Sequence, residues 1–281
     1  KERNIDKNYL IQTTSTQFVN KLNKIDHSLI KETLKYFKIN EPVHVGAYAT
    51  VPTLTGLGSS SSLVVGLINC IMKLKNIKLD NNKIISIAYK IEREICGYNG
   101  GWQDQIISQI GGFVKVNISK DSKLKIKKIK KNGTLNQLVN NNLMLVYTEH
   151  KRDSSTIILS QKKNINFVIK QYDLIKPLTK EIPIALKKKN PALIAEIFKR
   201  HWVIKKKISS QMSNKQINDL YDFLIKNCNF LGGKLIGAGG GGFLLMLTKN
   251  KKKTIELLKK NNINYLNFKI EDMGSRILKD L

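Results

Sequence analysis

A glycine- and serine-rich stretch in the early part of the chain leads directly into an apolar segment. It reads Pro52-Thr-Leu-Thr-Gly56-Leu57-Gly58-Ser59-Ser60-Ser61-Ser62, and the following ten residues, 63–72, have the length of a helix. Glycines let backbone N–H groups approach a ligand closely, and a helix that begins here directs its unpaired N–H groups and its positive dipole end at the loop. The stretch indicates an anion site, most often one for phosphate. The alternative is an ordinary serine-capped helix after a flexible turn.

Two carboxylates follow at positions that suit phosphoryl transfer. Glu92 lies near the end of a predicted helix over residues 81–95, and Asp104 follows the glycine-rich loop 97–101. Phosphoryl transfer uses carboxylates to hold Mg²⁺ and to orient or deprotonate the attacking hydroxyl. Taken singly, Glu92 on a solvated helix face and Asp104 as a helix N-cap are equally good interpretations.

A third stretch, residues 237–242, carries four consecutive glycines between two apolar strands. It reads Gly237-Ala-Gly239-Gly240-Gly241-Gly242, and Phe243 follows. A plain hairpin turn needs one or two glycines, and more of them weaken a sheet. We therefore expect a turn that approaches another backbone or a ligand closely.

Hydrophobic spacing predicts the elements that position these stretches. We expect a helix over 15–37, a strand over 42–51, a short helix from Gln105 that ends at Gly111–Gly112, and a hairpin of 113–118 and 124–129. A buried strand over 142–148 follows, and 152–228 is helical, with breaks at three prolines, Pro177, Pro183 and Pro191. Strands flank the four glycines, and a helix over 251–261 and a strand over 266–270 close the chain.

Composition describes a globular protein without a membrane span or a cysteine framework. The chain has 281 residues, 41% of them hydrophobic, and only three cysteines, Cys70, Cys96 and Cys228. These cysteines form neither a metal cluster nor an even disulfide set, and the opening residues do not resemble a signal peptide, so we expect a reducing, cytoplasmic setting. The formal net charge of +28 comes mostly from lysine, with five arginines among 49 basic residues. Base readout favours arginine, so we expect solvated lysines and no specific nucleic-acid partner.

Together, these motifs resemble the GHMP small-molecule kinases, which include galactokinase and the homoserine, mevalonate and phosphomevalonate kinases. The Pro52–Ser60 loop is similar to their second signature, which wraps the ATP phosphates, except that Leu54 stands where many members have glycine. Residues 232–243 resemble the third signature, and Glu92, Gly97 and Asp104 resemble the acidic block of mevalonate kinase and galactokinase. Further stretches resemble the D-glycero-D-manno-heptose 7-phosphate kinases of this family: 100–105, 147–154, 201–209 and 232–243.

The resemblance implies roles for individual residues. Asp104 is the expected catalytic carboxylate, and Ser60 and Glu92 are the expected Mg²⁺ ligands. The expected ATP-binding residues are Gly56, Leu57, Gly58, Ser59, Ser60 and Ser61. The expected substrate or active-site-loop residues are Gln103, Arg152, His201, Gly237, Gly239, Gly240 and Gly241. A sugar phosphate needs cations, and we expect them among Arg152, His201, Lys205, Lys206 and Lys234.

The resemblance also implies an α+β fold in two domains, a ribosomal-protein-S5-like half over 1–138 and a ferredoxin-like half over 139–281. The first signature of the family is missing here, so we expect a fragment or a split gene that lacks the first strands. The expected reaction is ATP- and Mg²⁺-dependent phosphorylation of the anomeric hydroxyl of the heptose 7-phosphate.

Three alternatives stay open. The first is a different sugar 1-kinase, acting on fucose, galactose or a uronic acid. The second is a nucleotide-binding protein without turnover, and the third is a polyanion-binding protein that depends on the +28 charge. The sequence does not indicate an oligomeric state.

Overall fold

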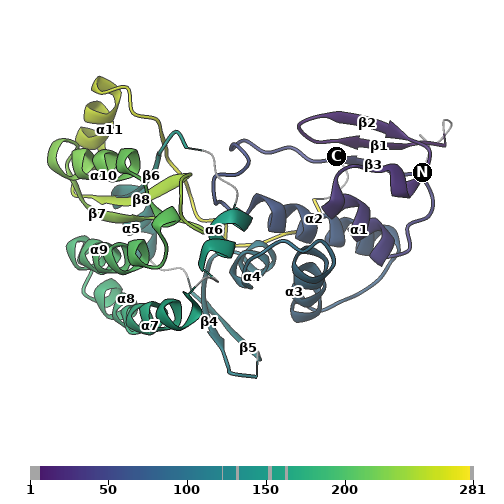
Figure 1. Ribbon diagram of the computed structural model, residues 1–281, viewed down its shortest axis with the longest axis horizontal. Helices are drawn as coiled ribbons and strands as arrows, with labels where there is room; N and C mark the ends of the chain where they lie inside the picture. Colours follow the sequence, from purple (N-terminus) through teal and green to yellow (C-terminus); the bar gives the residue numbers. More distant parts are fainter. Residues whose placement is uncertain (1–6, 122, 131–132, 151–153, 162–163, 279–281) are drawn as a thin grey trace. The chain divides into compact units, whose positions relative to one another are not determined.

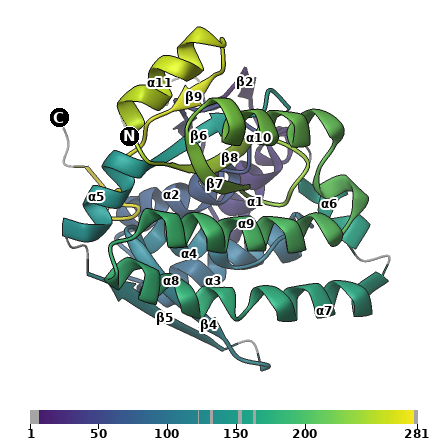
Figure 2. The same ribbon diagram turned by 90° about the vertical axis from the view of Figure 1, so that its left-hand side faces the viewer.

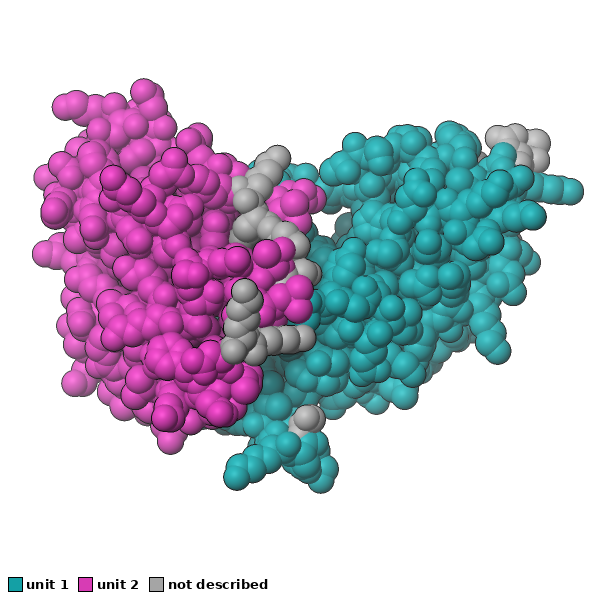
Figure 3. Space-filling view, in the orientation of Figure 1, with its two compact units in different colours: residues 1–52, 58–129, 271–281 teal, residues 53–57, 130–270 magenta. Residues whose placement is uncertain are grey.

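The computed structural model describes residues 7–121, 123–130, 133–150, 154–161 and 164–278 (Figure 1). The chain divides into two compact units, which are coloured separately in Figure 3: residues 1–52, 58–129 and 271–281 form the first, and residues 53–57 and 130–270 form the second. The domain bounds predicted from the sequence, 1–138 and 139–281, stay a prediction. The compact units differ from them in giving 53–57 and 130–138 to the second unit and the last eleven residues to the first.

Three short strands form a sheet near the start of the first unit. Its order is β2-β1-β3, with β1 antiparallel to β2 and parallel to β3. The strands are β1 (Tyr9–Gln12), β2 (Thr16–Val19) and β3 (His44–Gly46). The predicted helix over 15–37 was therefore wrong at its start: residues 16–19 pair with β1, a 3-10 turn η1 (Leu22–Lys24) follows, and α1 spans only Ser28–Tyr36.

The predicted strand over 42–51 was too long. Only three of its residues are in strand conformation, because β1 is four residues long and pairs with β3 at three positions. Parallel pairing across more than thirty residues of intervening chain leaves no local signal that would mark the end of the strand.

Helix α2 (Ser59–Leu74) is the centre of the first unit. One side of it, including Leu67 and Ile71, packs with β1 and α1 in one hydrophobic cluster. Another side, including Val64 and Ile68, packs with helix α3 (Asn81–Tyr89) in a second cluster. Burial on two sides explains why this helix is apolar over most of its surface, and it fixes the position of the loop that precedes the helix.

The rest of the first unit follows α3 without a break. A π-helical turn, η2 (Lys90–Ile95), leads to α4 (Gln103–Ile110), and Gly111, with a φ of 67°, ends that helix as predicted. The hairpin of β4 (Phe113–Ile118) and β5 (Leu124–Ile129) confirms the predicted bounds. The segment from Glu271 returns to this unit, where the Ser275 N–H donates to the Ser108 carbonyl at 2.7 Å.

The second unit is built on a four-stranded antiparallel sheet in the order β7-β8-β6-β9. Side chains of Trp202, Ile217, Leu224 and Leu258 cover it and form the main core with Met144 and Val146. Figure 2 shows the strands of this sheet with the helices beside them. The strands are β6 (Leu143–Tyr147), β7 (Phe230–Leu235), β8 (Phe243–Thr248) and β9 (Tyr265–Leu266).

Eight helical segments accompany this sheet in the described residues. They are α5 (Gly133–Asn142), α6 (Ser154–Gln161), α7 (Ile165–Ile175), α8 (Leu178–Lys187), α9 (Pro191–Lys207), the 3-10 turn η4 (Ser210–Met212), α10 (Lys215–Asn227) and α11 (Lys251–Lys260). Pro177 and Pro191 stand at helix starts as predicted, but Pro183 lies inside α8 instead of breaking it. No helix in the described ranges has both the length and the apolar character needed to cross a membrane.

Candidate active site

The glycine-serine loop leads into α2 through left-handed backbone conformations. Gly56 has a φ of 80° and Gly58, the N-cap residue of α2, a φ of 72°. The first backbone bond of the helix runs from the Ser62 N–H to the Gly58 carbonyl at 3.0 Å. The N–H groups of residues 59–61 therefore precede the helical bonding pattern, at the positive end of the helix dipole. This geometry is suited to binding an anion.

Leu54, the predicted departure from the family pattern, also has a positive φ, of 61°. The loop thus keeps the left-handed conformation that glycine would adopt without strain, and at Leu54 this conformation introduces backbone strain. Its side chain is 54% exposed, so little burial compensates for that strain.

The serines after Gly58 do not cap the helix. No side chain caps the start of α2. Instead, the Ser60 hydroxyl donates to Glu92 Oε1 at 2.6 Å, and the Ser61 hydroxyl donates to Glu92 Oε2 at 2.7 Å. The structure therefore disfavours the alternative of a serine-capped helix and joins two of the predicted site residues, Ser60 and Glu92, in direct contact.

Glu92 is a fully buried carboxylate in the π-helical turn η2, with 0% of it exposed. Besides the two serines, Gln105 Nε2 donates to its Oε2 at 2.6 Å, and Arg93 Nη1 lies 3.4 Å from its Oε1. π-helical turns occur frequently at functional sites. The alternative that Glu92 lies on a solvated helix face is therefore wrong, because its side chain is buried. The surrounding donors and Arg93 are what a buried carboxylate needs.

Gln105 and Arg93 are contacts of Glu92 that we did not predict from the sequence. Gln105 is fully buried, and its Oε1 has no hydrogen-bond partner in the described structure. The sequence did offer a signal, because Gln105 lies one residue beyond Asp104 and Arg93 is one of only five arginines. Neither position reveals by spacing alone that its side chain turns toward Glu92.

Arg93 also organises the loop that leads to Asp104. Its Nη1 donates to the carbonyl of Asn99 at 3.1 Å. A Cβ added at Gly100 would lie 2.5 Å from the Arg93 guanidinium carbon, so this position has no room for a side chain beside it. One guanidinium thus connects the Glu92 carboxylate with the glycine-rich loop before α4.

Asp104 lies in the first turn of α4, beside the N-cap glycine of α2. A Cβ added at Gly58 would lie 3.4 Å from both Cβ and Cγ of Asp104, so the carboxylate-bearing side chain is next to the phosphate-type loop. Trp102, and not Asp104, is the N-cap residue of α4. Gln103 begins the helix and is exposed. The structure therefore brings Gly58, Ser60, Glu92 and Asp104 together within the first unit.

The residues present fit a magnesium ion that is held partly by a ligand's phosphates. Mg²⁺ in such sites takes one or two protein oxygens and completes its shell with phosphate and water. The Ser60 hydroxyl donates a hydrogen bond to Glu92 and so keeps its oxygen lone pairs available, while Glu92 supplies the negative charge. The described residues contain no group of three or more His, Cys, Asp or Glu side chains that would hold a metal without such help.

The four-glycine turn of the second unit makes close backbone contacts, as the sequence predicts. Gly237, Gly239, Gly240, Gly241 and Gly242 all have positive φ values. A Cβ added at Gly241 would lie 2.5 Å from the His150 carbonyl oxygen, and one at Gly242 would lie 2.1 Å from the Thr55 carbonyl oxygen. Segment 53–57, the first half of the glycine-serine loop with Gly56 and Leu57, therefore packs directly on this turn.

Lys205, one of the predicted cations, is bonded to the same turn. Its Nζ donates to the Gly237 carbonyl at 2.6 Å, which anchors the start of the glycine run to α9. Lys206 Nζ contacts Asn218 Oδ1 at 3.3 Å, and Lys234 Nζ lies 5.1 Å from the centre of the Phe198 ring. Burial lowers the pKa of Lys234.

His201 is not the cation that we expected from the sequence. Burial, with the nearby charges of Lys234 and Lys205, lowers the pKa of its ring to about 3. Its Nδ1 is buried without a hydrogen-bond partner in the described structure. A neutral ring cannot serve as a phosphate-binding cation at neutral pH. Arg152, the other cation that we favoured, lies outside the described residues.

Family models match both halves of the chain. The GHMP kinases N terminal domain matches residues 27–112, and the GHMP kinases C terminal domain matches residues 184–266. The first match contains the glycine-serine loop, Glu92 and Asp104, and the second contains His201 and the four-glycine turn. Both predicted signatures therefore lie inside the matched regions.

Individual relatives are also kinases. The D-glycero-alpha-D-manno-heptose 7-phosphate kinase of Campylobacter jejuni is 28% identical over 240 residues, which cover 83% of this chain and 70% of that protein. The mevalonate kinase of Methanocaldococcus jannaschii is 28% identical over 236 residues, which cover 83% and 70%. A crystal structure of a D-glycero-D-manno-heptose 1-phosphate kinase from Bacteroides thetaiotaomicron has a TM-score of 0.73 at 19% identity and covers 96% of this chain and 82% of that one.

Proposed function

This chain belongs to the GHMP kinases, phosphotransferases with an alcohol acceptor, and we propose that it transfers the γ-phosphoryl group of ATP to the anomeric hydroxyl of D-glycero-D-manno-heptose 7-phosphate. The fold is the two-part α+β fold of this family. Kinase activity follows from the family, and the particular sugar and the roles of particular residues are the content of the proposal.

One observation carries the assignment of the site: Ser60 and Ser61 bond the buried Glu92 carboxylate, while Asp104 lies against Gly58 of the same loop. Phosphoryl transfer needs a phosphate cradle, a metal-holding oxygen pair and a carboxylate for the acceptor hydroxyl. All three requirements are met by residues of the first unit: the N–H groups at the start of α2, the pair of Ser60 and Glu92, and Asp104 beside Gly58.

Each group has a defined task in the proposed reaction. The N–H groups at the start of α2 orient the phosphates, and Ser60 with Glu92 would hold the metal ion. Mg²⁺, when bound, neutralises charge on the transferred phosphoryl group. Asp104 orients the acceptor hydroxyl and accepts its proton as the oxygen attacks phosphorus and ADP leaves. Gln105 and Arg93 hold Glu92 in place through the contacts at 2.6 and 3.4 Å.

The choice of sugar rests on the Campylobacter jejuni relative and on the heptose-kinase-like stretches of the sequence. The mevalonate kinase of Methanocaldococcus jannaschii is as similar in identity and coverage, so mevalonate is the acceptor against which the proposal must be tested. In the proposed complex, Arg152 meets the 7-phosphate, and the glycine turn at 237, 239, 240 and 241 lies beside the acceptor.

A panel of acceptors tests the proposed substrate. The purified chain would be given Mg-ATP with heptose 7-phosphate, mannose, fucose, galactose, a uronic acid, mevalonate or no acceptor, and ³¹P NMR would identify the product. We expect the highest kcat/KM and an anomeric phosphate with heptose 7-phosphate. A higher kcat/KM for mevalonate or for an unphosphorylated sugar would assign the chain to a different GHMP activity.

A further inference from the structure

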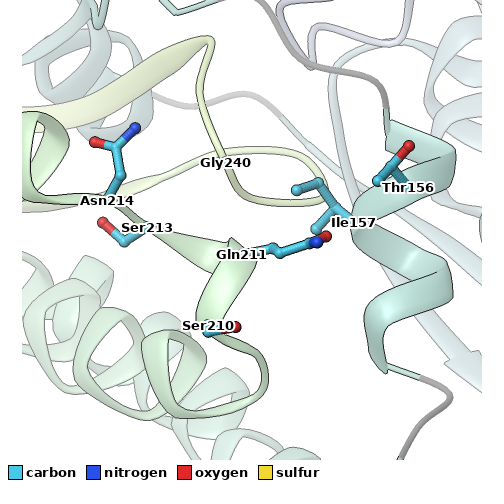
Figure 4. A pocket seen from close by; sticks show the side chains of 7 residues that line it. All are labelled: Thr156, Ile157, Ser210, Gln211, Ser213, Asn214 and Gly240. Atoms are coloured by element: carbon cyan, nitrogen blue, oxygen red, sulfur yellow. The ribbon is translucent and has the colours of Figure 1, made fainter.

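A pocket of about 400 Å³ lies in the second unit, beside the four-glycine turn. Residues of α6, of η4 and the segment after it, and of the turn line it: Thr156, Ile157, Ser210, Gln211, Ser213, Asn214 and Gly240. Figure 4 shows the Gln211 side chain extending toward Ile157, with the backbone of Gly240 beside them. The volume lies in the range of about 300–1,000 Å³ that is usual for small-molecule sites.

The pocket shares a wall with the part of the glycine turn that reaches the phosphate-type loop. A Cβ at Gly240 would lie 2.7 Å from Ile157 Cδ1 and 3.1 Å from the Gln211 carbonyl oxygen, so the turn forms one side of the pocket. Two residues later, Gly242 contacts Thr55, which is three residues before Gly58. Within this unit, the same turn therefore contacts both the pocket lining, at Gly240, and segment 53–57, at Gly242.

The lining is hydrogen-bonding but uncharged. Among the residues described around the pocket none is charged, in a chain that has 49 lysines and arginines. A phosphate there would lack the cation that binding an anion requires. Hydroxyl groups, which both donate and accept, match amides and serine hydroxyls, and the side chain of Ile157 with the backbone of Gly240 suits the C–H groups of a sugar.

We propose that this pocket binds the uncharged, hydroxyl-bearing part of the acceptor sugar, with Gln211 and Asn214 as residues that determine acceptor specificity. The inference rests on the proposed sugar-kinase function and adds a place for the acceptor that the predicted site residues, apart from Gly240, do not include.

The hydrogen bonds of the lining residues leave specific groups for the sugar. Asn214 Oδ1 accepts the Ile217 N–H at 2.8 Å as the N-cap of α10, so the NH₂ group of Asn214 is the part that can bind a ligand. The Ser213 hydroxyl donates to Asn218 Oδ1 at 3.0 Å and keeps its lone pairs as acceptors. Gln211 is exposed, and its side-chain amide can donate through NH₂ and accept through C=O.

These contacts define two informative substitutions and a control. Gln211→Leu removes an exposed amide without changing the backbone that contacts Gly240. Asn214→Asp keeps an oxygen that can cap α10, removes the NH₂ donor and adds a negative charge at the start of that helix. Gln137→Leu is the matched control, because Gln137 is an exposed glutamine on the other cavity of this unit, which α5, α8 and α9 line.

The test measures KM for heptose 7-phosphate and for ATP separately. Loss of one neutral hydrogen bond weakens binding by about 3- to 10-fold. We expect Gln211→Leu and Asn214→Asp each to raise the KM for the sugar by that factor, with the KM for ATP and the effect of Gln137→Leu within about twofold of wild type. If wild type phosphorylates the sugar and both variants keep its KM, the pocket is not the acceptor site, although the kinase assignment stands.

A binding measurement separates failure of the pocket from failure of the proposed function. Saturation-transfer NMR would follow unphosphorylated heptose with the whole chain, without turnover. If wild type phosphorylates no sugar, the proposed function fails. The pocket proposal then survives only if heptose shows saturation transfer with wild type and with Gln137→Leu but not with Gln211→Leu. No saturation in wild type would overturn it.

Discussion

The Glu92 cluster of the first unit and the glycine turn of the second unit solve the same problem, positioning of groups, by opposite means. Around Glu92 the work is done by side chains: two serines, a glutamine and an arginine converge on one carboxylate. The glycine turn depends instead on the absence of side chains. A Cβ at Gly241 would lie 2.5 Å from the His150 carbonyl oxygen, and one at Gly242 would lie 2.1 Å from the Thr55 carbonyl oxygen. Removing a polar group from the Glu92 cluster should therefore reduce activity. Adding a Cβ to the glycine turn should instead reduce the stability of the fold.

The largest expected effect belongs to the glycine turn. Gly242→Ala places a Cβ 2.1 Å from the Thr55 carbonyl oxygen at a φ of 92°, so overlap and backbone strain add. We expect the free energy of unfolding to fall by at least about 3 kcal/mol, as measured by chemical denaturation.

Gly66→Ala provides the control for that substitution. Gly66 lies inside α2 with nothing within 4 Å of its added Cβ, and alanine favours a helix there by about 1 kcal/mol. The same chemical change should thus act with opposite sign at the two glycines. A Gly242→Ala variant as stable as wild type would show that Thr55 and the turn are not packed as described.

The next effect is chemical. Glu92→Gln keeps the shape of the cluster but removes its negative charge, so the proposed Mg²⁺ site would lose its charged ligand. We expect kcat to fall on the order of 100-fold, with a higher Mg²⁺ concentration needed for half-maximal rate. Glu94→Gln, at an exposed position of the same turn, should change neither. Equal Mg²⁺ dependence in wild type and Glu92→Gln would contradict the proposed role of Glu92 as a metal ligand.

His201 sharpens the comparison through pH. Its pKa is about 3 in the folded protein because burial disfavours the charged ring, and it is near 6.5 when unfolded. The unfolded chain therefore binds the extra proton below about pH 6.5, and stability is lost as pH falls from there toward 3. We expect His201→Gln to be less destabilised than wild type between pH 7.5 and 5, by about 1 kcal/mol after discounting for the partly exposed ring. Parallel stability curves for the two proteins would contradict this.

The smallest effect is expected at Leu54, where a side chain stands at a positive φ. Leu54→Gly relieves about 1 kcal/mol of backbone strain but gives the unfolded chain more freedom, which costs a similar amount. The net change in unfolding free energy should stay below about 1 kcal/mol by chemical denaturation. A loss of more than about 2 kcal/mol would show that the leucine side chain, although 54% exposed, is part of the packing.

How far the sequence predicts each part depends on whether its cause is local. The four glycines and the hairpin of β4 and β5 follow from composition and alternation within a few residues, and both predictions hold. Strands β1 and β2 were missed because their signal lies in pairing, including the parallel pairing of β1 with a strand more than thirty residues away. A four-residue strand has too short a pattern to outweigh the helical spacing that follows it.

The candidate site divides in the same way. Ser60, Glu92 and Asp104 were predicted from their motifs, and the structure places them around one loop. Gln105 and Arg93 were not predicted, because a neutral amide and a salt bridge to a sequence neighbour leave no characteristic spacing. The charge of His201 was expected from the resemblance and from the cations that a sugar phosphate needs, and neither carries information about burial, the main cause of its low pKa.

The measurement that tests the account most directly is ADP release from Mg-ATP and heptose 7-phosphate by wild type and Asp104→Asn, with thermal protection by ATP measured in parallel. The account predicts sugar-dependent release by wild type, a loss of about 1,000-fold or more in Asp104→Asn, and equal protection of both proteins by ATP. Release by Asp104→Asn within about tenfold of wild type would contradict the placement of the reaction beside Gly58 and Asp104.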